Sequence, residues 1–118
     1  MLDKSEENWL AGEQCLNDGR LNAAANRFYY SVFQAVLTYA SAKRDYHQTR
    51  EAKVHTDMGQ LVKTVGKKSV YYGRIFVDLR SLRETADYQP DTPLKGKIEE
   101  LLPPCKRIRT FFLEKARV

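Results

Sequence analysis

The sequence has few cysteines, glycines and prolines, and its apolar runs are short. The 118 residues include two cysteines, six glycines and four prolines. Cys15 and Cys105 show no metal-ligand spacing, and two reduced thiols are a simpler interpretation than a disulfide between them. We therefore expect neither a metal site nor a cofactor.

Long hydrophobic runs are missing as well. The apolar runs span only a few residues, whereas a membrane-spanning helix needs roughly 18 or more. Residues 1–7 are acidic and polar, unlike a secretory signal peptide. A composition of 42% hydrophobic and 30% charged residues is typical of a folded chain with one core. We expect a single cytoplasmic domain over residues 1–118 and no membrane partner.

Positive charge is in excess and is unevenly distributed. The net charge is +5, with −2 over residues 1–42, +3 over residues 43–94 and +4 over residues 95–118. A basic second half fits a polyanionic partner such as RNA. It fits an ordinary solvated surface almost equally well, so charge alone does not decide the function.

Apolar residues recur at helical spacing along nearly the whole chain. The pattern predicts a first helix capped by Ser5 and ending at Asp18-Gly19. A second helix, capped by Asn22, extends to about Ala42. Its two adjacent apolar stripes predict that this helix is central and packs against more than one neighbour.

The second half continues the helical pattern with interruptions. Residues 43–52 are expected to form a polar loop, before a third helix of about 53–65 that Gly66 ends. Ser69 is the predicted cap of a fourth helix, which ends at Tyr88 before Gln89-Pro90.

A fifth segment follows the prolines. Thr92-Pro93 is the predicted start, with the proline at the first helical position, and Pro103-Pro104 should kink or split the segment. The fold class is therefore all-α: an antiparallel up-and-down bundle of four long helices plus a shorter or kinked C-terminal segment.

Two stretches, residues 24–35 and 82–91, place arginine and tyrosine within apolar helical patterns. On the second helix, Arg27, Tyr30 and Gln34 form one polar line at spacings of three and four residues. An arginine among apolar neighbours needs a partner, since burying an unpaired charge is costly.

The fourth helix carries the matching set. Arg83 and Asp87 are four residues apart with Tyr88 beside them, so Arg83 could meet Arg27 across a shared groove. An internal salt-bridge network that fixes helix register is the structural alternative. His55, near the start of the third helix, is more simply interpreted as a capping or surface group.

These motifs together resemble the HEPN family, specifically its small stand-alone bacterial and archaeal members. The resemblance rests on ANRFYYSVFQA at residues 25–35, His55, Gly-Arg at 73–74, and LRETADY at 82–88. Their order and spacing agree over roughly residues 5–115. The resemblance implies an all-α bundle that commonly forms homodimers, and Tyr71 and Tyr72, expected to be exposed, favour the same state.

The family also implies chemistry. Many HEPN proteins are metal-independent endoribonucleases, often toxins or defence effectors, and others bind nucleotides or accompany small nucleotidyltransferases. In the ribonucleases, an arginine is followed four to six residues later by a histidine that moves a proton. Here Arg83 is followed at positions 87–90 by Asp-Tyr-Gln-Pro, so that histidine is absent.

Three functions remain open at this point. The first is binding of RNA or a nucleotide, beside a small nucleotidyltransferase in a toxin–antitoxin or defence-like pair; its residues are Arg27, Tyr30, Gln34, Arg83 and Tyr88. The second is metal-independent RNA cleavage, in which Arg83 acts with Asp87 or His55. The third is a helical interaction module whose arginines only stabilise the bundle.

Overall fold

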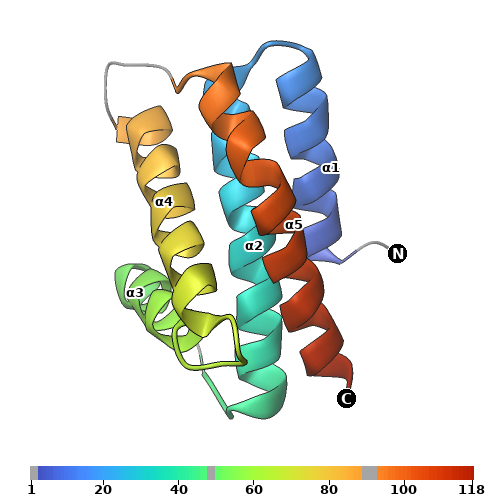
Figure 1. Ribbon diagram of the computed structural model, residues 1–118, viewed down its shortest axis with the longest axis vertical. Coiled ribbons are helices and arrows are strands. Elements are labelled where there is room, and N and C mark those ends of the chain that lie inside the picture. The colour runs from blue at the N-terminus through green and yellow to red at the C-terminus, as the bar shows by residue number, and fades with distance from the viewer. Residues whose placement is uncertain (1–2, 48–49, 89–92) are drawn as a thin grey trace.

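The computed structural model describes residues 3–47, 50–88 and 93–118, and this part of the chain is helical without strands. Its helices are α1 (Lys4–Asn17), α2 (Leu21–Lys43), α3 (Glu51–Val62), α4 (Ser69–Tyr88) and α5 (Lys95–Arg117). Figure 1 shows that α1 and α4 run in one direction and α2 and α5 in the other. The predicted all-α bundle is confirmed. No helix in these ranges combines the length and the hydropathy that a bilayer span requires.

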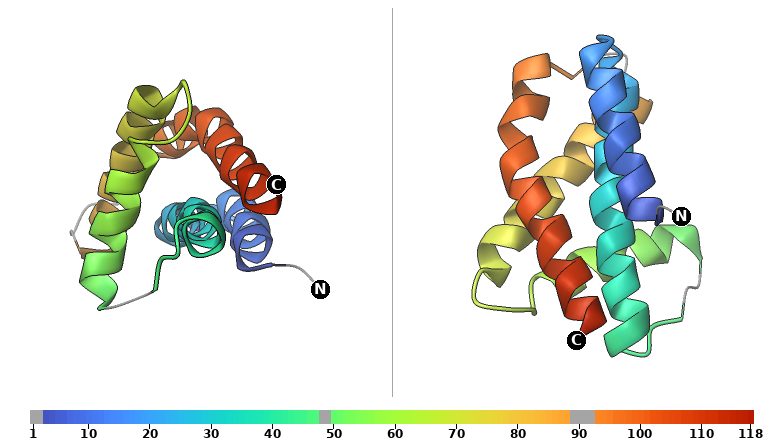
Figure 2. Two further views of the ribbon diagram at one scale, coloured as in Figure 1. Left: turned by 90° about the horizontal axis from the view of Figure 1, so that it is seen from below. Right: turned by 90° about the vertical axis from the view of Figure 1, so that its right-hand side faces the viewer.

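The short helix is α3 rather than the C-terminal one. With 12 residues, α3 is about half as long as α5, which has 23. It crosses the lower end of the bundle instead of running along it (Figure 2). The four long helices are thus α1, α2, α4 and α5, and α3 packs against α2 and α4.

Helix α2 is central, as its two apolar stripes predict, and it contacts each of the other four helices. Phe28 meets Trp9 of α1 edge to face at 4.9 Å, and Tyr39 meets Phe112 of α5 at 5.4 Å. A Cβ at Gly12 would lie 2.8 Å from the Phe28 ring, so this glycine allows α1 and α2 to pack closely.

The predicted cap of α1 is wrong. Asp3 is the N-cap, and its carboxylate accepts a hydrogen bond from the Glu6 amide at 2.7 Å. Ser5 lies inside the helix, where it is buried and donates to the Ser31 carbonyl oxygen of α2 at 2.8 Å. Both serine and aspartate are favoured caps, so the sequence pattern did not separate them.

Asn22 is not a cap either, because the chain turns into α2 earlier. Gly19 has a φ of +76°, and the Arg20 amide donates to the Cys15 carbonyl oxygen at 2.8 Å. This closing geometry at the end of α1 leads directly to Leu21, the first residue of α2.

The other boundaries move by a few residues. Helix α2 includes Lys43 and α3 begins at Glu51, both within the predicted loop of 43–52, and α3 ends at Val62 rather than near 65. Gly66, with a φ of +81°, lies in the turn beyond. Ser69 is the first residue of α4 rather than its cap, and α4 ends at Tyr88 as predicted. Gln89, Pro90 and Thr92 lie outside the described residues.

Helix α5 continues through both internal prolines. It begins at Lys95 rather than at Pro93, and Pro103 and Pro104 bend it without splitting it (Figure 2). Buried residues on either side of the prolines, Ile98 and Ile108, keep both halves packed in the core.

Candidate functional site

Arg83 points from α4 into the bundle and is surrounded by tyrosine rings. Its side chain is 9% exposed. The guanidinium carbon lies 5.0 Å from the centroid of the Tyr29 ring and 5.8 Å from that of Tyr30, both on α2. The ring of Tyr88, a residue that is 72% exposed, lies 5.7 Å away. All three are cation–π distances. The contacts therefore extend from a largely buried guanidinium to the exposed ring of Tyr88.

The hydrogen bonds of Arg83 are incomplete. Nη1 lies 3.4 Å from Oδ2 of Asp87, which is long for a charged pair. Within the described part of the chain, its buried Nε atom has no hydrogen-bond partner. Burial alone would lower the pKa of Arg83, but the adjacent Tyr30, Tyr29 and Tyr88 outweigh burial and raise it. Arg83 therefore carries a permanent positive charge and, within the residues described, one N–H donor without an acceptor.

Arg27 reaches the same tyrosine from one turn earlier on α2. Its guanidinium carbon is 5.7 Å from the centroid of the Tyr30 ring, against which Arg83 also lies. Nη1 of Arg27 donates to the Asn8 side chain of α1 at 3.0 Å. The two arginines that the sequence predicts to converge thus do so around Tyr30.

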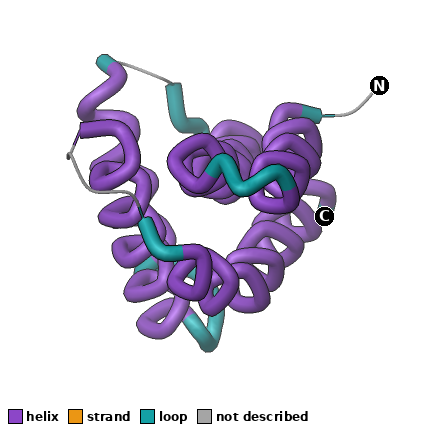
Figure 3. Tube along the Cα trace, turned by 90° about the horizontal axis from the view of Figure 1, so that it is seen from above, coloured by secondary structure: helices purple, strands orange, loops and turns teal. Residues whose placement is uncertain are grey.

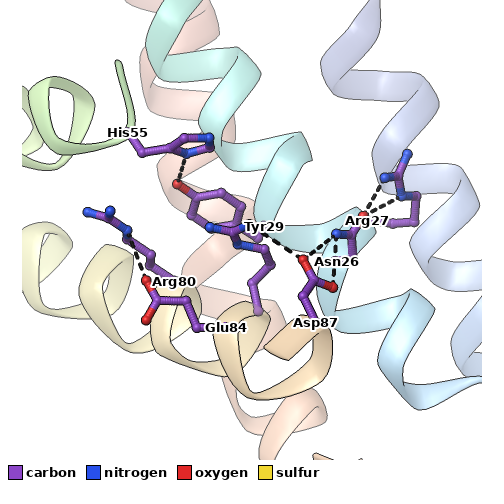
Figure 4. Close-up of polar contacts among 8 residues, drawn as sticks. Asn26, Arg27, Tyr29, His55, Arg80, Glu84 and Asp87 are labelled. Carbon is purple, nitrogen blue, oxygen red and sulfur yellow. Dashed lines mark hydrogen bonds and ion pairs between the residues drawn. The ribbon is translucent and has the colours of Figure 1, made fainter. Parts of the chain in front are cut away.

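Arg27, Tyr30, Arg83 and Tyr88 form one cluster, and Asn26 connects its α2 side to its α4 side. The sequence interpretation did not single out Asn26. Its Nδ2 donates to Oδ2 of Asp87 at 3.0 Å, while its Oδ1 accepts from Nε of Arg27 at 3.0 Å (Figure 4). A carboxamide can do both because it carries donors and acceptors. Asn26 thereby links α2 to Asp87 on α4.

His55 lies close to the cluster but is buried, so its interpretation as a capping or surface group is wrong. It is 5% exposed, its Nδ1 lies 2.6 Å from the Tyr29 hydroxyl, and its ring stacks on Phe33 at 4.4 Å. Burial raises the pKa of Tyr29 although Arg80 and Arg83 act to lower it, so this hydroxyl stays protonated at neutral pH. Tyr29 therefore stands between His55 and Arg83, meeting one with its hydroxyl and the other with its ring.

Arg80 and Glu84 lie beside this group, one turn apart on α4 (Figure 4). Nε of Arg80 is 3.3 Å from Oε1 of Glu84, an ion-pair distance, yet this atom lacks an aligned hydrogen bond among the described residues. The spacing of four residues was the available signal for this pair, which the sequence interpretation missed along with Tyr29.

Gln34 is the predicted site residue that the cluster does not include. It is half-buried one turn beyond Tyr30. Over residues 3–47, 50–88 and 93–118, no hydrogen bond or ion pair joins its side chain to Arg27 or Arg83. Its place in a binding site remains a prediction.

Comparison with known proteins identifies a family. A family model described as HEPN domain matches residues 1–116. Neither the curated proteins nor the solved structures gave a significant match. The described residues include no group of three or more histidine, cysteine, aspartate or glutamate side chains placed to hold a metal ion.

Proposed function

The chain belongs to the HEPN domain family, and on this premise we propose that it binds RNA or a nucleotide at the cluster of Arg27, Tyr30, Arg83 and Tyr88. The family is generally linked to nucleotide- or RNA-related activity. One observation supports the proposal most: guanidinium groups from two helices lie against one tyrosine ring, and Nε of the more buried one has no hydrogen-bond partner in the described part of the chain.

The chemistry of the cluster suits a phosphate attached to a base. An arginine guanidinium donates two parallel hydrogen bonds to phosphate oxygens. A phosphate would replace Asp87 as the acceptor for Nη1 of Arg83, because the existing contact is 3.4 Å long. The exposed ring of Tyr88 offers a face on which a base can stack. Such binding needs no general base.

The test is titration of the protein with uridine monophosphate and with a short RNA, followed by amide chemical shifts. Arg83→Met keeps the apolar stem and should weaken binding roughly tenfold or more, since loss of one such arginine contact costs about 1–3 kcal/mol. Arg74→Met removes the same charge from an exposed position of the same helix and serves as the control. Equal affinities of the two variants would contradict the proposal.

RNA cleavage without metal is the second candidate, and the contact between Tyr29 and His55 behind Arg83 favours it. In that reaction a 2′-hydroxyl oxygen attacks phosphorus while its proton passes to a base, and the bond to the 5′ oxygen breaks as that oxygen gains a proton. Asp87 is the carboxylate in contact with Arg83, whereas His55 is buried with its Nδ1 against the Tyr29 hydroxyl.

Incubation of the protein with structured RNA in EDTA separates cleavage from binding. Cleavage that survives chelation and is lost in Arg83→Met would support the second candidate. RNA that stays intact while still shifting the amide signals would support binding without cleavage.

A small nucleotidyltransferase partner and a homodimer complete the proposal, and both rest on the family. Tyr71 is 39% exposed at the start of α4, but Tyr72, expected to be exposed, is 6% exposed and packs against Phe111. Of the two tyrosines, Tyr71 therefore still favours a contact there. Sedimentation at micromolar concentration should give a dimer mass, and a nucleotidyltransferase encoded next to this chain should co-purify with it. A monomer or an uncomplexed chain would contradict the respective part.

A further inference from the structure

Positive charge gathers at the opposite end of α4 from Arg83, around two neighbouring hollows. The hollows measure about 400 Å³ and 530 Å³ and share Tyr72 of α4 and Phe111 of α5. The charged residues that line the pair are Lys67, Lys68, Lys106, Arg107, Lys115 and Glu114. Five cations thus face one carboxylate.

The floor between the hollows is aromatic. Phe111 is half-buried, with its ring 5.6 Å from that of Tyr72. Nζ of Lys115 lies 5.6 Å from the centroid of the Phe111 ring. A Cβ at Gly66 would lie 2.7 Å from the same ring, so the turn before α4 approaches it as closely as only glycine permits. The ring is thereby held in place with part of its surface accessible.

The cations around this floor have no ion-pair partner among the described residues. None of the five lies within ion-pair distance of a carboxylate there, whereas Arg109 of α5 is paired with Glu6. Four of them are lysines, whose charge falls on flexible side chains at the rim. The surface therefore combines positive charge with an apolar ring. Helices α4 and α5 form adjoining walls of the bundle (Figure 2), and Figure 3 shows the described chain as helices joined by loops.

We propose that this surface, made of the two hollows around Phe111, binds single-stranded nucleic acid. A base would stack on Phe111 while the backbone phosphates lie along Lys67, Lys68 and Lys115. Single strands use both features at once, because every base has a face for stacking and every linkage carries a charge.

The proposed surface is separate from the Arg83 cluster. Tyr72 and Arg83 are eleven residues apart in one helix, about 16 Å along its axis. The two residues also pack on different neighbours, since Tyr72 meets α5 and Arg83 meets α2. This inference therefore stands or fails independently of the proposed function.

A charge-reversal pair tests the surface with the full chain. The variant is Lys67→Glu/Lys68→Glu. The control is Lys95→Glu/Lys97→Glu, which makes the same change of net charge at the N-terminal end of α5, away from Phe111 (Figure 1). The probe is a labelled oligouridylate followed by fluorescence anisotropy over a salt series. Losing two phosphate contacts should weaken binding roughly tenfold and reduce the slope of log affinity against log salt by about 1.4.

The control should leave the affinity within about twofold and the slope unchanged. Phe111→Leu keeps an apolar side chain without an aromatic face, and it should weaken binding roughly fivefold or more. Equal losses in both charge-reversal variants, or an unaffected Phe111→Leu, would overturn the proposal. So would an oligonucleotide that does not bind while anionic vesicles or an acidic peptide bind through the same lysines.

One readout separates this surface from the Arg83 cluster. Amide shifts caused by uridine monophosphate near Arg83 should persist in Lys67→Glu/Lys68→Glu and disappear in Arg83→Met. If the shifts are absent from the unmodified protein but the oligouridylate still binds through Lys67 and Lys68, the proposed function fails and the second surface stands.

Discussion

Two arginines of this bundle are buried to nearly the same degree, and their surroundings differ. The side chain of Arg109 is 12% exposed and that of Arg83 is 9% exposed. Nε of Arg109 donates to the Ser5 hydroxyl at 2.8 Å, and its Nη2 pairs with the Glu6 carboxylate. Arg83 has a 3.4 Å contact to Asp87, and its Nε has no hydrogen-bond partner among the described residues.

The difference separates a structural arginine from a candidate binding arginine. Arg109 joins α5 to α1, and its partners offset much of the cost of burying its charge. Arg83 receives partial compensation from the tyrosine rings of α2, which lie at cation–π distance from its guanidinium. A buried donor without an acceptor is uncommon in folded proteins, so the one found in Arg83 among the described residues needs an explanation that Arg109 does not.

The largest expected effect is on stability when Arg109 is replaced. Arg109→Met removes the hydrogen bond to Ser5 and the pair with Glu6, so Glu6 loses its charged partner while Ser5 keeps its hydrogen bond to Ser31. We expect the free energy of unfolding in urea to fall by about 2 kcal/mol, less than for a fully buried pair because Glu6 is partly exposed. A fall of less than about 0.5 kcal/mol would remove the contrast between the two arginines.

Tyr29→Phe tests the contact behind Arg83. The variant keeps the ring against Arg83 but removes the hydroxyl that lies 2.6 Å from Nδ1 of His55. The free energy of unfolding should fall by about 1 kcal/mol, because the buried hydrogen bond between the Tyr29 hydroxyl and His55 is lost. Tyr39→Phe is the control, since that hydroxyl accepts from Arg44 at 3.2 Å nearer the surface and should matter less. Equal losses would show that the contact between Tyr29 and His55 is not special.

Most of the fold could be predicted from periodicity, whereas the helix starts could not. The two stripes of α2 predict its central place because each stripe needs a neighbour to cover it. The cap of α1 was misassigned because Asp3 and Ser5 are equally suitable by residue type, and the burial of Ser5 depends on Ser31 of α2. Such choices are made by tertiary contacts, which a local pattern does not contain.

The candidate site was predictable to the extent that it depends on spacing within one helix. Arg27 and Tyr30 are three residues apart and share a face of α2, so their neighbourhood follows from the sequence. The contact between Tyr29 and His55 joins α2 to α3, and it depends on how α3 crosses the bundle. Asn26 was missed for a similar reason, since its partner Asp87 lies 61 positions later.

Arg83→Met should change stability much less than the same substitution at Arg109. Removing the guanidinium loses the tyrosine contacts but also removes a buried donor that has no partner among the residues the structure describes. We expect a change in the unfolding free energy within about 0.5 kcal/mol of zero in urea. A loss as large as that of Arg109→Met would make Arg83 a structural residue and would favour the interaction-module alternative.

Asp87→Asn should have the smallest effect on stability and the most informative effect on function. The asparagine still offers an oxygen to Asn26. The contact of Asp87 with Arg83 is long and the Asp87 side chain is about a quarter exposed, so stability should change by less than about 0.3 kcal/mol. If the cluster binds phosphate, affinity for uridine monophosphate should rise, because a negative charge beside Arg83 is removed. If Asp87 instead takes the proton from a 2′-hydroxyl, the rate of RNA cleavage should fall sharply, since an amide is not a base. The two candidate functions therefore predict changes of opposite sign for one substitution, and a change in neither would mean that Asp87 belongs to the scaffold alone.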